Sequence, residues 1–299
     1  MPFAPDPFAA LRSAARHVRR FRGKTFVVKI GGELIDRPES RTSIGEQLAL
    51  LWSFSIPIVV VHGGGASVDA LCQSLGLPAV KVAGRRVTPP DVLRAAGMAL
   101  KGDAQVRLLS SLLSSGLPAV GLSGQDAGLI TASRRPPVEV DGIEVDFGMV
   151  GDITGVDPSL VARLVDGGFV PVVAPLTADP DGAVYNTNAD SVAAALAIAL
   201  RAEKLLFLVG VPGLLQDPAD PSSLVPYADL AAVEALVASG AVGGGMRPKL
   251  DAARHALEGG VASVHLVSGV GPDNLLVEIF TNEGSGTMLV GRGNGGAAA

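Results

Sequence analysis

Two apolar segments of this chain run directly into consecutive glycines. Residues 26–28 (Phe-Val-Val) lead into Lys29-Ile30-Gly31-Gly32, and residues 58–61 (Ile-Val-Val-Val) lead into His62-Gly63-Gly64-Gly65. A strand that ends in glycines and is followed by a helix exposes backbone N–H groups, which bind phosphate. No Gly-Lys-Ser or Gly-Lys-Thr follows either loop, which excludes the P-loop of nucleoside triphosphatases. The sequence therefore predicts a phosphate site of a different construction.

The composition excludes several classes of function. The chain has 299 residues, of which 48% are hydrophobic, enough to bury a large core in one domain or two closely joined lobes. Its net charge of −5 argues against a nucleic-acid binder, which needs a basic face. The longest apolar run, residues 192–200, is too short to span a bilayer, and no secretory segment stands near the start. The single cysteine, Cys72, suits a reducing compartment, so we expect a cytoplasmic protein without nucleic-acid or membrane partners.

Short β-branched runs alternate with longer helical stretches along the chain. The expected strands are continuously apolar, as in a sheet buried on both faces, and cover residues 25–30, 56–61, 119–122, 170–174, 205–209 and 263–267. Helices are expected at residues 91–113, 158–166, 190–201 and 248–257. Turn residues, including Asp141-Gly142, predict β-hairpins within 129–150 and 178–184. This order predicts a layered α/β fold around a mainly parallel sheet.

The two ends of the chain differ from its middle. Asp6 and Pro7 fit the start of a helix, whose apolar stripe would consist of Phe8, Leu11, Ala15 and Val18. The opposite side carries Arg12, Arg16, Arg19, Arg20 and Arg22. Because targeting leaders are also Arg-rich and amphipathic, residues 1–23 are either a helical arm or a disordered or targeting leader. The Gly/Ala-rich residues 292–299 are predicted to form a disordered tail.

Two lysines stand where a positive charge is costly without a partner. Lys29 ends an apolar strand, where a bound anion would stabilise it; the alternative is an edge-strand lysine that reaches water. Lys249 follows Gly243-Gly244-Gly245 and Pro248 at the start of a predicted helix, where the helix dipole disfavours a cation. It is either a group that faces phosphate or an ordinary surface lysine.

Two further segments carry more polar groups than local structure needs. Residues 186–190 (Asn-Thr-Asn-Ala-Asp) open an apolar helix, where one side chain would suffice as an N-cap. Asp190 could hold the two lysines or meet a metal. Arg86, within residues 84–88 (Gly-Arg-Arg-Val-Thr), could hold a carboxylate through two parallel hydrogen bonds, unless it belongs to a solvated arginine pair. The histidines lack metal-ligand spacing: His62 is expected to support its loop, and His17, His255 and His265 to be surface or packing residues.

The ordered set of motifs resembles the amino acid kinase family, and within it the acetylglutamate kinases. The matching pieces are VVKIGGELI, VVVHGGG, GRRVT, AVGLSGQDAGLI, PVVAP, YNTNADSVA, GGGMRPK and FTNEGSGTM, which together span residues 24–290. The resemblance implies a three-layer sandwich with about eight strands in its central sheet. It also implies that residues 24–203 form an N-terminal lobe for the amino acid and for dimerisation, and that residues 204–291 form a C-terminal lobe for the nucleotide.

The resemblance assigns roles to individual residues. It implies that Lys29 and Lys249 neutralise the transferred phosphoryl group and that Asp190 orients both lysines. Acetylglutamate and its phosphoryl group would be bound by Gly63, Gly64, Gly65, Arg86, Asn186 and Asn188. ATP would be bound, partly through backbone N–H groups, by Gly31, Gly32, Gly210, Val211, Gly213, Leu214, Gly245 and Met246. Because the substrate γ-carboxylate is already an ionised nucleophile, no general base is expected, and Mg²⁺ would be held mostly by ATP and water.

The N-terminal arm and the FTNEGSGTM segment are similar to the arginine-inhibited branch of acetylglutamate kinases. In that branch the N-terminal helices join dimers into a hexameric ring, and L-arginine binds beside the helix. The resemblance therefore implies a homodimer or hexamer, feedback inhibition by arginine and a PII signal protein as a further partner of the ring.

Three other functions are compatible with parts of the pattern. A kinase for carrier-linked aminoadipate or glutamate would share the phosphate loops, but the intact segment 84–88 favours a free acetylated amino acid. Aspartokinase is disfavoured because no room remains for regulatory domains after residue 290. A non-catalytic arginine or nucleotide sensor would not need Lys29, Asp190 and Lys249.

Overall fold

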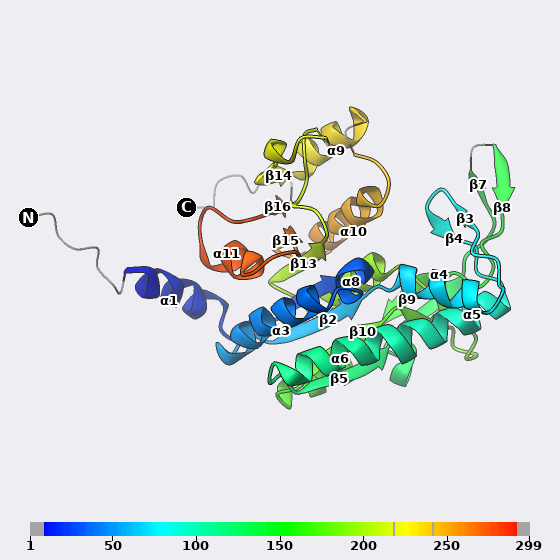
Figure 1. The fold of residues 1–299 in the computed structure, drawn as a ribbon, viewed down its shortest axis with the longest axis horizontal. Helices are drawn as coiled ribbons and strands as arrows, with labels where there is room; N and C mark the ends of the chain where they lie inside the picture. The colour runs from blue at the N-terminus through cyan, green and yellow to red at the C-terminus, as the bar shows by residue number, and fades with distance from the viewer. Residues whose placement is uncertain (1–8, 141, 218, 241, 292–299) are drawn as a thin grey trace, which may run out of the picture.

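An eight-stranded sheet forms the centre of the molecule (Figure 1). The computed structural model describes residues 9–140, 142–217, 219–240 and 242–291. In spatial order the strands are β14 (Tyr227–Asp229), β16 (Thr287–Val290), β15 (Ser263–Ser268), β13 (Lys204–Val209), β1 (Phe26–Ile30), β2 (Ile58–His62), β10 (Val170–Ala174) and β5 (Ala119–Ser123). Among the described pairs of this sheet, β15–β16 is antiparallel and the others are parallel. The predicted mainly parallel sheet is confirmed, and the ends of the six expected strands are shifted by at most two residues; β14 and β16 were not among the expected strands.

Helices cover both faces of this sheet, as a three-layer sandwich requires. One face carries α7 (Ser159–Asp166), α8 (Ala189–Ala199) and α10 (Met246–Glu258); the other carries α3 (Pro38–Ser53), α6 (Gln105–Ser114) and α11 (Asn274–Phe280). Side chains alternate along β1, so Val27 joins the core under α8 and Val28 joins the core under α3. The same alternation puts Lys29 on the α8 face.

The helix predicted over residues 91–113 is interrupted by a wider turn. α5 (Pro90–Gly97) continues through a π-helical segment, Met98–Ala104, into α6. A Cβ atom at Gly64 would lie 2.9 Å from Leu100 Cδ2, so this segment packs tightly on the second glycine loop. Single π-helical turns within α-helices often lie at functional sites.

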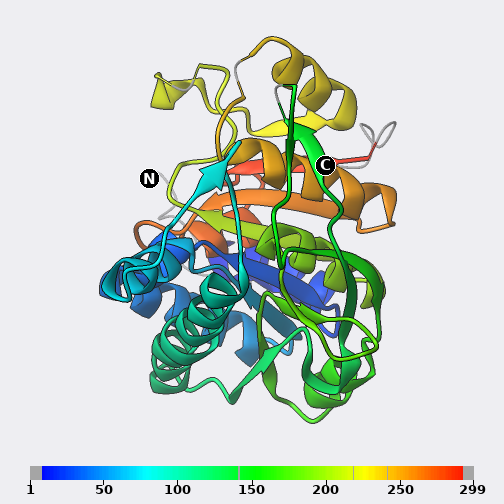
Figure 2. The same cartoon turned by 90° about the vertical axis from the view of Figure 1, so that its right-hand side faces the viewer.

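A second sheet and two small hairpins lie beside the main sheet. The second sheet has the order β12 (Val184–Asn186), β11 (Leu176–Ala178), β6 (Ile130–Arg134) and β9 (Gly151–Val156). The hairpins are β3 (Lys81–Val82) with β4 (Arg85–Arg86), and β7 (Val138–Val140) with β8 (Ile143–Val145). Both hairpins project at the right of Figure 1, the side that faces the viewer in Figure 2. The hairpins predicted within 129–150 and 178–184 are confirmed as β7–β8 and β11–β12.

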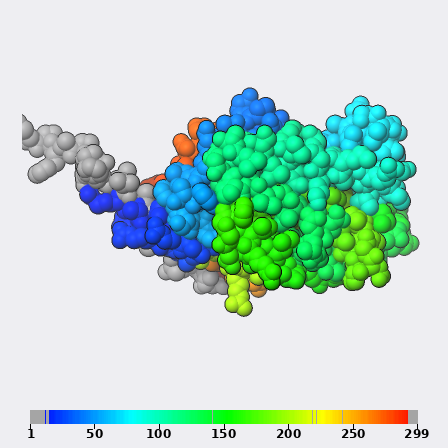
Figure 3. Space-filling model, turned by 90° about the horizontal axis from the view of Figure 1, so that it is seen from below, coloured from blue at the N-terminus to red at the C-terminus, as the bar shows by residue number. Residues whose placement is uncertain are grey.

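The shorter helices include the two predicted to follow the glycine loops. These are α2 (Gly32–Ile35) and α4 (Gly65–Ser74); α9 is Leu230–Ala238, and 3-10 turns cover Asp126–Gly128 and Pro221–Ser223. α1 (Ala9–Phe21) extends from one end of the body (Figure 3), with its arginines exposed and Phe21 buried. Among the described helices, none is long and apolar enough to cross a membrane. The predicted cap residues Asp6 and Pro7, the stripe residue Phe8, the turn residue Asp141 and the tail 292–299 lie outside the described residues.

Candidate active site

The carboxyl end of β1 lies where the order of strands reverses. β2, β10 and β5 follow on one side of β1, while β13 and β15 follow on the other. In open α/β sheets, ligands bind in the crevice at such a point. The glycine loops after β1 and β2 and the loop after β13 meet here, because these three strands are neighbours and parallel.

At this point one buried carboxylate holds two lysines from distant parts of the chain. Lys29 points towards the start of α8, where its Nζ lies 2.8 Å from Asp190 Oδ1. Lys249 Nζ approaches from the first turn of α10 and lies 3.4 Å from Asp190 Oδ2. The side chains of Lys29 and Asp190 are each 7% exposed, so water screens this pair weakly. Two lysines against one carboxylate leave a net positive charge, which attracts an anion.

The lysines keep Asp190 ionised. Burial alone would raise the pKa of Asp190, but the charges and hydrogen bonds of Lys29 and Lys249 outweigh it and hold this pKa below its ordinary value. Asn188 is the N-cap of α8, and its Oδ1 accepts hydrogen bonds from the backbone N–H of Asp190 (2.8 Å) and of Ser191 (3.1 Å). Asn188 therefore fixes the helix end from which Asp190 projects.

The third glycine cluster brings Lys249 to the site. Gly245 is the N-cap of α10, and no other atom lies within 4 Å of the place a Cβ atom would take there. Pro248 lies in the first turn, as predicted, and Met246 packs against the core under α10. The Nζ of Lys249 donates a hydrogen bond to the Gly245 carbonyl at 3.1 Å, so the cation lies over the beginning of its own helix.

The two glycine loops pack backbone against backbone. A Cβ atom at Gly32 would lie 2.9 Å from the Cα and N atoms of Gly64, so this approach requires glycine. The position after Gly64 is different, because a Cβ atom at Gly65 would meet no atom within 4 Å. Part of the glycine content thus serves the contact between the loops, and the space beside Gly65 is open.

Two of the N–H groups in these loops already have partners within the sheet. The N–H of Gly31 donates to the Leu208 carbonyl, and that of Gly63 to the Ile30 carbonyl, each at 3.0 Å. These two bonds extend the sheet and engage the donors. The N–H groups that remain for an anion are those that open α2 and α4, since the first N–H groups of a helix have no partner within it.

His62 supports the second loop, as predicted. Its side chain is fully buried, and its Nδ1 donates a hydrogen bond to the Gly63 carbonyl at 3.0 Å, because a carbonyl oxygen can only accept. Burial lowers the pKa of His62 to about 4. The imidazole is therefore neutral near pH 7 and holds the loop rather than carrying charge.

Arg86 and Asn186 reach the site from the β3–β4 hairpin and from the second sheet. Arg86 Nη1 donates to Asp69 Oδ1 at 2.6 Å, and Nη2 donates to the Gly65 carbonyl at 2.9 Å. Thr88 Oγ1 donates to the Arg86 carbonyl and accepts from Asn186 Nδ2, each at 3.3 Å. The two predicted substrate residues are thus joined, and Asp69 is a member of the site that the sequence did not indicate.

The predicted nucleotide residues after β13 divide into exposed and packed positions. Gly210 and Val211 are exposed, with 43% of Val211 open to solvent. Gly213 and Leu214 are buried, and the Leu214 N–H donates to Thr287 Oγ1 at 2.9 Å. Leu214 therefore anchors the loop from within the core, and Gly210 and Val211 are the residues a nucleotide could touch.

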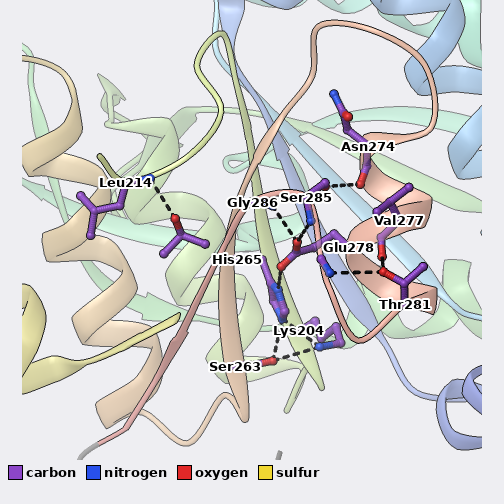
Figure 4. Close-up of polar contacts among 12 residues, drawn as sticks. Lys204, Leu214, Ser263, His265, Asn274, Val277, Glu278, Thr281, Ser285 and Gly286 are labelled. Carbon is purple, nitrogen blue, oxygen red and sulfur yellow. Dashed lines mark hydrogen bonds and ion pairs between the residues drawn. The ribbon is translucent and has the colours of Figure 1, made fainter. Parts of the chain in front are cut away.

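A second polar cluster, which sequence reasoning missed, crosses β13, β15 and α11 (Figure 4). Lys204 Nζ lies 2.8 Å from His265 Nε2, and His265 Nδ1 lies 2.6 Å from Glu278 Oε1. Glu278 Oε2 accepts hydrogen bonds from the backbone N–H groups of Ser285 (2.8 Å) and Gly286 (2.9 Å). We call these five residues the Lys204 cluster.

Burial governs the charges in the Lys204 cluster. It lowers the pKa of Lys204 to about 8 and that of His265 to about 4. Burial would raise the pKa of Glu278, but its hydrogen bonds to His265 and to the backbone hold it below its ordinary value. The cluster is therefore an ammonium and a carboxylate bridged by a neutral imidazole. The available signal was the single acidic residue within the apolar run of α11.

Known proteins identify the family. The family model described as the amino acid kinase family matches residues 24–268. The chain belongs to the amino acid kinase family. It is 59% identical to the acetylglutamate kinase of Myxococcus xanthus (strain DK1622), over 97% of this chain and 96% of that protein. It is 42% identical to the acetylglutamate kinase of Symbiobacterium thermophilum, over 96% of this chain and 98% of that protein.

Solved structures agree with the fold. N-acetylglutamate synthase from Neisseria gonorrhoeae, complexed with coenzyme A and N-acetyl-glutamate, matches with a TM-score of 0.82 and 29% identity, over 95% of this chain and 63% of that chain. The same enzyme complexed with coenzyme A and L-arginine matches with a TM-score of 0.82 and 28% identity, over 95% of this chain and 65% of that chain. This chain thus spans just under two thirds of the synthase.

Proposed function

We propose that this chain transfers the γ-phosphoryl group of ATP to the γ-carboxylate of N-acetyl-L-glutamate, a step in arginine biosynthesis. The observation that carries the proposal is the buried Asp190, with Lys29 and Lys249 on its two oxygens at the carboxyl end of β1. The 59% identity to an acetylglutamate kinase over nearly the whole chain supports the choice of substrate.

This arrangement suits a reaction between two anions. A carboxylate oxygen of the substrate attacks the γ-phosphorus, the bond from that phosphorus to the β–γ bridging oxygen breaks, and the products are an acyl phosphate and ADP. The nucleophile is ionised at neutral pH, so no general base is needed. Lys29 and Lys249 would offset the repulsion and stabilise charge in the transition state, which is the main task in phosphoryl transfer.

Binding roles follow from the positions around this centre. Arg86, Asn186 and Asn188 are proposed to hold acetylglutamate, and the loops after β1 and β13 with the start of α10 are proposed to hold ATP. In the proposed division into lobes at residues 203 and 204, Lys29 and Asp190 belong to one lobe and Lys249 to the other. Closure of the lobes would then adjust the position of Lys249. The cytoplasm is the proposed location.

The residues present fit a magnesium ion that enters with the nucleotide. Among the described residues, no group of three or more His, Cys, Asp or Glu side chains is placed to hold a metal, and both oxygens of Asp190 face lysines. Mg²⁺ keeps several waters and is commonly bound through substrate phosphates. When bound, it would neutralise charge on the β- and γ-phosphate oxygens of ATP.

A hydroxamate assay for acyl phosphate tests the proposed reaction. The substrates to compare are acetylglutamate, glutamate, aspartate and aminoadipate, each with ATP and with or without arginine. Product from acetylglutamate alone is expected. Product from aminoadipate instead would favour a lysine-type pathway, and nucleotide binding without product from any substrate would favour a sensor.

The Lys204 cluster supports a second proposal, which is that L-arginine inhibits this enzyme. A buried ammonium and a buried carboxylate match the carboxylate and guanidinium of arginine, and Lys204 Nζ lies 5.2 Å from the Phe21 ring at the end of α1. We infer that arginine binds here by taking the place of the internal His265 bridge. The synthase structure that contains L-arginine supports this choice of ligand.

Replacing Glu278 by glutamine should weaken this inhibition. A hydrogen bond to a charged group contributes about 1.5–3 kcal/mol, so the arginine concentration for half inhibition should rise about tenfold or more. Activity without arginine should be retained, because the Lys204 cluster lies outside the proposed active site. Glu283→Gln, which changes an exposed carboxylate of the same segment, is the control. A melting transition should first confirm that both variants are folded. Equal sensitivity of the two variants to arginine would then contradict the inference.

The N-terminal arm is proposed to join dimers into a hexamer, to which a PII-type protein would bind. α1 extends from the body (Figure 3), and an exposed apolar row on the α5–α6 helix, consisting of Met98, Val106 and Leu113, is available for the dimer. Light scattering should give a hexamer for the whole chain and a dimer for a chain that lacks residues 1–23. The same number of subunits in both would exclude the ring.

A further inference from the structure

The guanidinium proposed to bind the substrate lies on a very small hairpin. β3 and β4 contain two residues each, and an isolated two-stranded hairpin is at best marginally stable in water. Lys81 and Arg86 are direct partners across this hairpin. The Arg86 side chain is nevertheless only 9% exposed, so contacts outside the hairpin must hold it.

Asp69 of α4 supplies the main contact. Its Oδ1 accepts a hydrogen bond from Arg86 Nη1 at 2.6 Å, and its Oδ2 accepts one from Lys81 Nζ at 2.7 Å. One carboxylate therefore bridges both strands of the hairpin. Burial would raise the pKa of Asp69, but its hydrogen bonds to Arg86 and Lys81 outweigh this and keep it ionised at neutral pH.

The same guanidinium is fixed to the start of α4. Arg86 Nη2 donates to the Gly65 carbonyl at 2.9 Å, and Gly65 is one helical turn before Asp69. These two bonds use two of the five N–H donors of a guanidinium, which leaves donors for a ligand. The Arg86 backbone is held as well, through Thr88 Oγ1. The guanidinium is thus set relative to the second glycine loop by a helix rather than by the hairpin.

We propose that Asp69 is a positioning residue that makes this site select the length of its substrate. The inference rests on the proposed function, in which Arg86 helps to hold acetylglutamate. It takes the α-carboxylate as the group that Arg86 binds, with the reacting γ-carboxylate at the second glycine loop. If the distance between these two points is fixed, only a diacid with the matching number of methylene groups between its carboxylates can reach both. Without Asp69 the hairpin could shift and accept a shorter or longer diacid.

The consequence is a change in specificity rather than a general loss of activity. Acetylaspartate is one methylene shorter than acetylglutamate, and acetyl-2-aminoadipate is one methylene longer. A rigid site usually separates substrates that differ by one methylene by about 10–200-fold in kcat/KM. Removing the contact between Asp69 and Arg86 should reduce this discrimination. It should also weaken the binding of acetylglutamate, because Arg86 is no longer held in the orientation that binds the substrate.

The test compares Asp69→Asn with Lys81→Met. Asparagine keeps the size of the side chain but loses its charge and one acceptor, whereas Lys81→Met leaves the Arg86–Asp69 pair in place. We would measure kcat and KM for ATP, acetylglutamate, acetylaspartate and acetyl-2-aminoadipate. For Asp69→Asn, the KM of acetylglutamate should rise about tenfold and the preference over the other two diacids should fall about tenfold, with the KM of ATP unchanged. Asp69→Glu should recover part of the preference.

The outcomes separate this inference from the proposed function. If the unmodified enzyme makes no acyl phosphate from acetylglutamate, the proposed function fails. If it does, and Asp69→Asn keeps the original preference among the three diacids, the positioning role is excluded. An equal loss for all three diacids with an unchanged melting temperature would also exclude it, because a merely structural role lowers every rate alike. Lys81→Met with the same loss of preference would assign the effect to the hairpin charge instead of Asp69.

Discussion

Lys249→Ala should lower kcat by about 10²–10³-fold, the usual loss when one donor to the developing charge of a transition state is removed. Lys249 shares Asp190 with Lys29, and together they supply the positive charge around this carboxylate. Its side chain is 17% exposed at the start of α10, so the fold should tolerate alanine. The change should appear mainly in kcat, measured with both substrates saturating, because the interaction strengthens as phosphoryl transfer proceeds.

Arg254→Ala provides a matched control for this loss. Arg254 lies on the same helix, is 49% exposed and forms a long ion pair of 3.8 Å with Asp251. Its removal changes the net charge of α10 by the same amount, so it should leave kcat close to normal. A normal kcat in Lys249→Ala, or an equal loss in Arg254→Ala, would contradict the role proposed for Lys249.

Asp190→Asn should destabilise the fold and abolish most of the activity together. The variant keeps the shape of the side chain but leaves the ammonium of Lys29 buried without its carboxylate. Breaking a buried ion pair in this way typically costs about 3–5 kcal/mol. We expect the free energy of unfolding, measured with urea, to fall by this amount. We also expect kcat to fall, because both lysines lose the group that orients them.

The pH dependence of this effect has a defined sign. The pKa of Asp190 lies below its ordinary value of 3.8, so the unfolded chain takes up this proton more readily than the folded chain. The carboxylate therefore contributes its full stabilisation above about pH 4 and loses it as the pH falls through the folded-state pKa. The difference in unfolding free energy between the original protein and Asp190→Asn should shrink in the same range.

Lys29→Met is the control that separates stability from chemistry. It replaces the cation on β1 by an uncharged side chain of similar size, while Asp190 keeps its contact with Lys249. A buried charge is thereby replaced by an apolar group, so the loss of stability should be smaller than in Asp190→Asn. The loss of kcat should be as large as in Lys249→Ala. Equal unfolding free energies for Asp190→Asn and the original protein would show that the pair is not essential to the fold.

The elements of this fold were predictable where a local pattern sets the backbone. The apolar run of β1 and the glycines after it required a buried parallel strand and a tight loop, and both are present. The π-helical segment was missed although a signal existed. Buried side chains recur every fourth residue at Val92, Ala96, Leu100, Ala104, Leu108 and Leu112. A repeat of four exceeds the 3.6 residues of an α-helical turn, and the wider segment takes up the difference.

The site was harder to predict because it is built from contacts between distant segments. Asp190 and Lys249 are 59 residues apart. The residues alone left Asp190 either holding the lysines or meeting a metal, and the family resemblance decided between the two. No local pattern indicated Asp69, which is an ordinary polar residue on the surface of α4 until the hairpin is folded against it. The engaged N–H groups of Gly31 and Gly63 could not be foreseen either, because their partners come from neighbouring strands.

The central place of β1 gives the two halves of the site different resistance to opening. Every residue of β1 has register partners in both β13 and β2, so its amide hydrogens exchange with solvent only when the whole sheet opens. The β3–β4 hairpin has two pairs of partners and can open alone. Lys29 thus belongs to the most persistent part of the molecule, whereas the backbone that carries Arg86 depends on the contacts of its side chain with α4. Signals that leave the protein folded can act on substrate capture and on the approach of α10, but cannot displace the strand that carries Lys29.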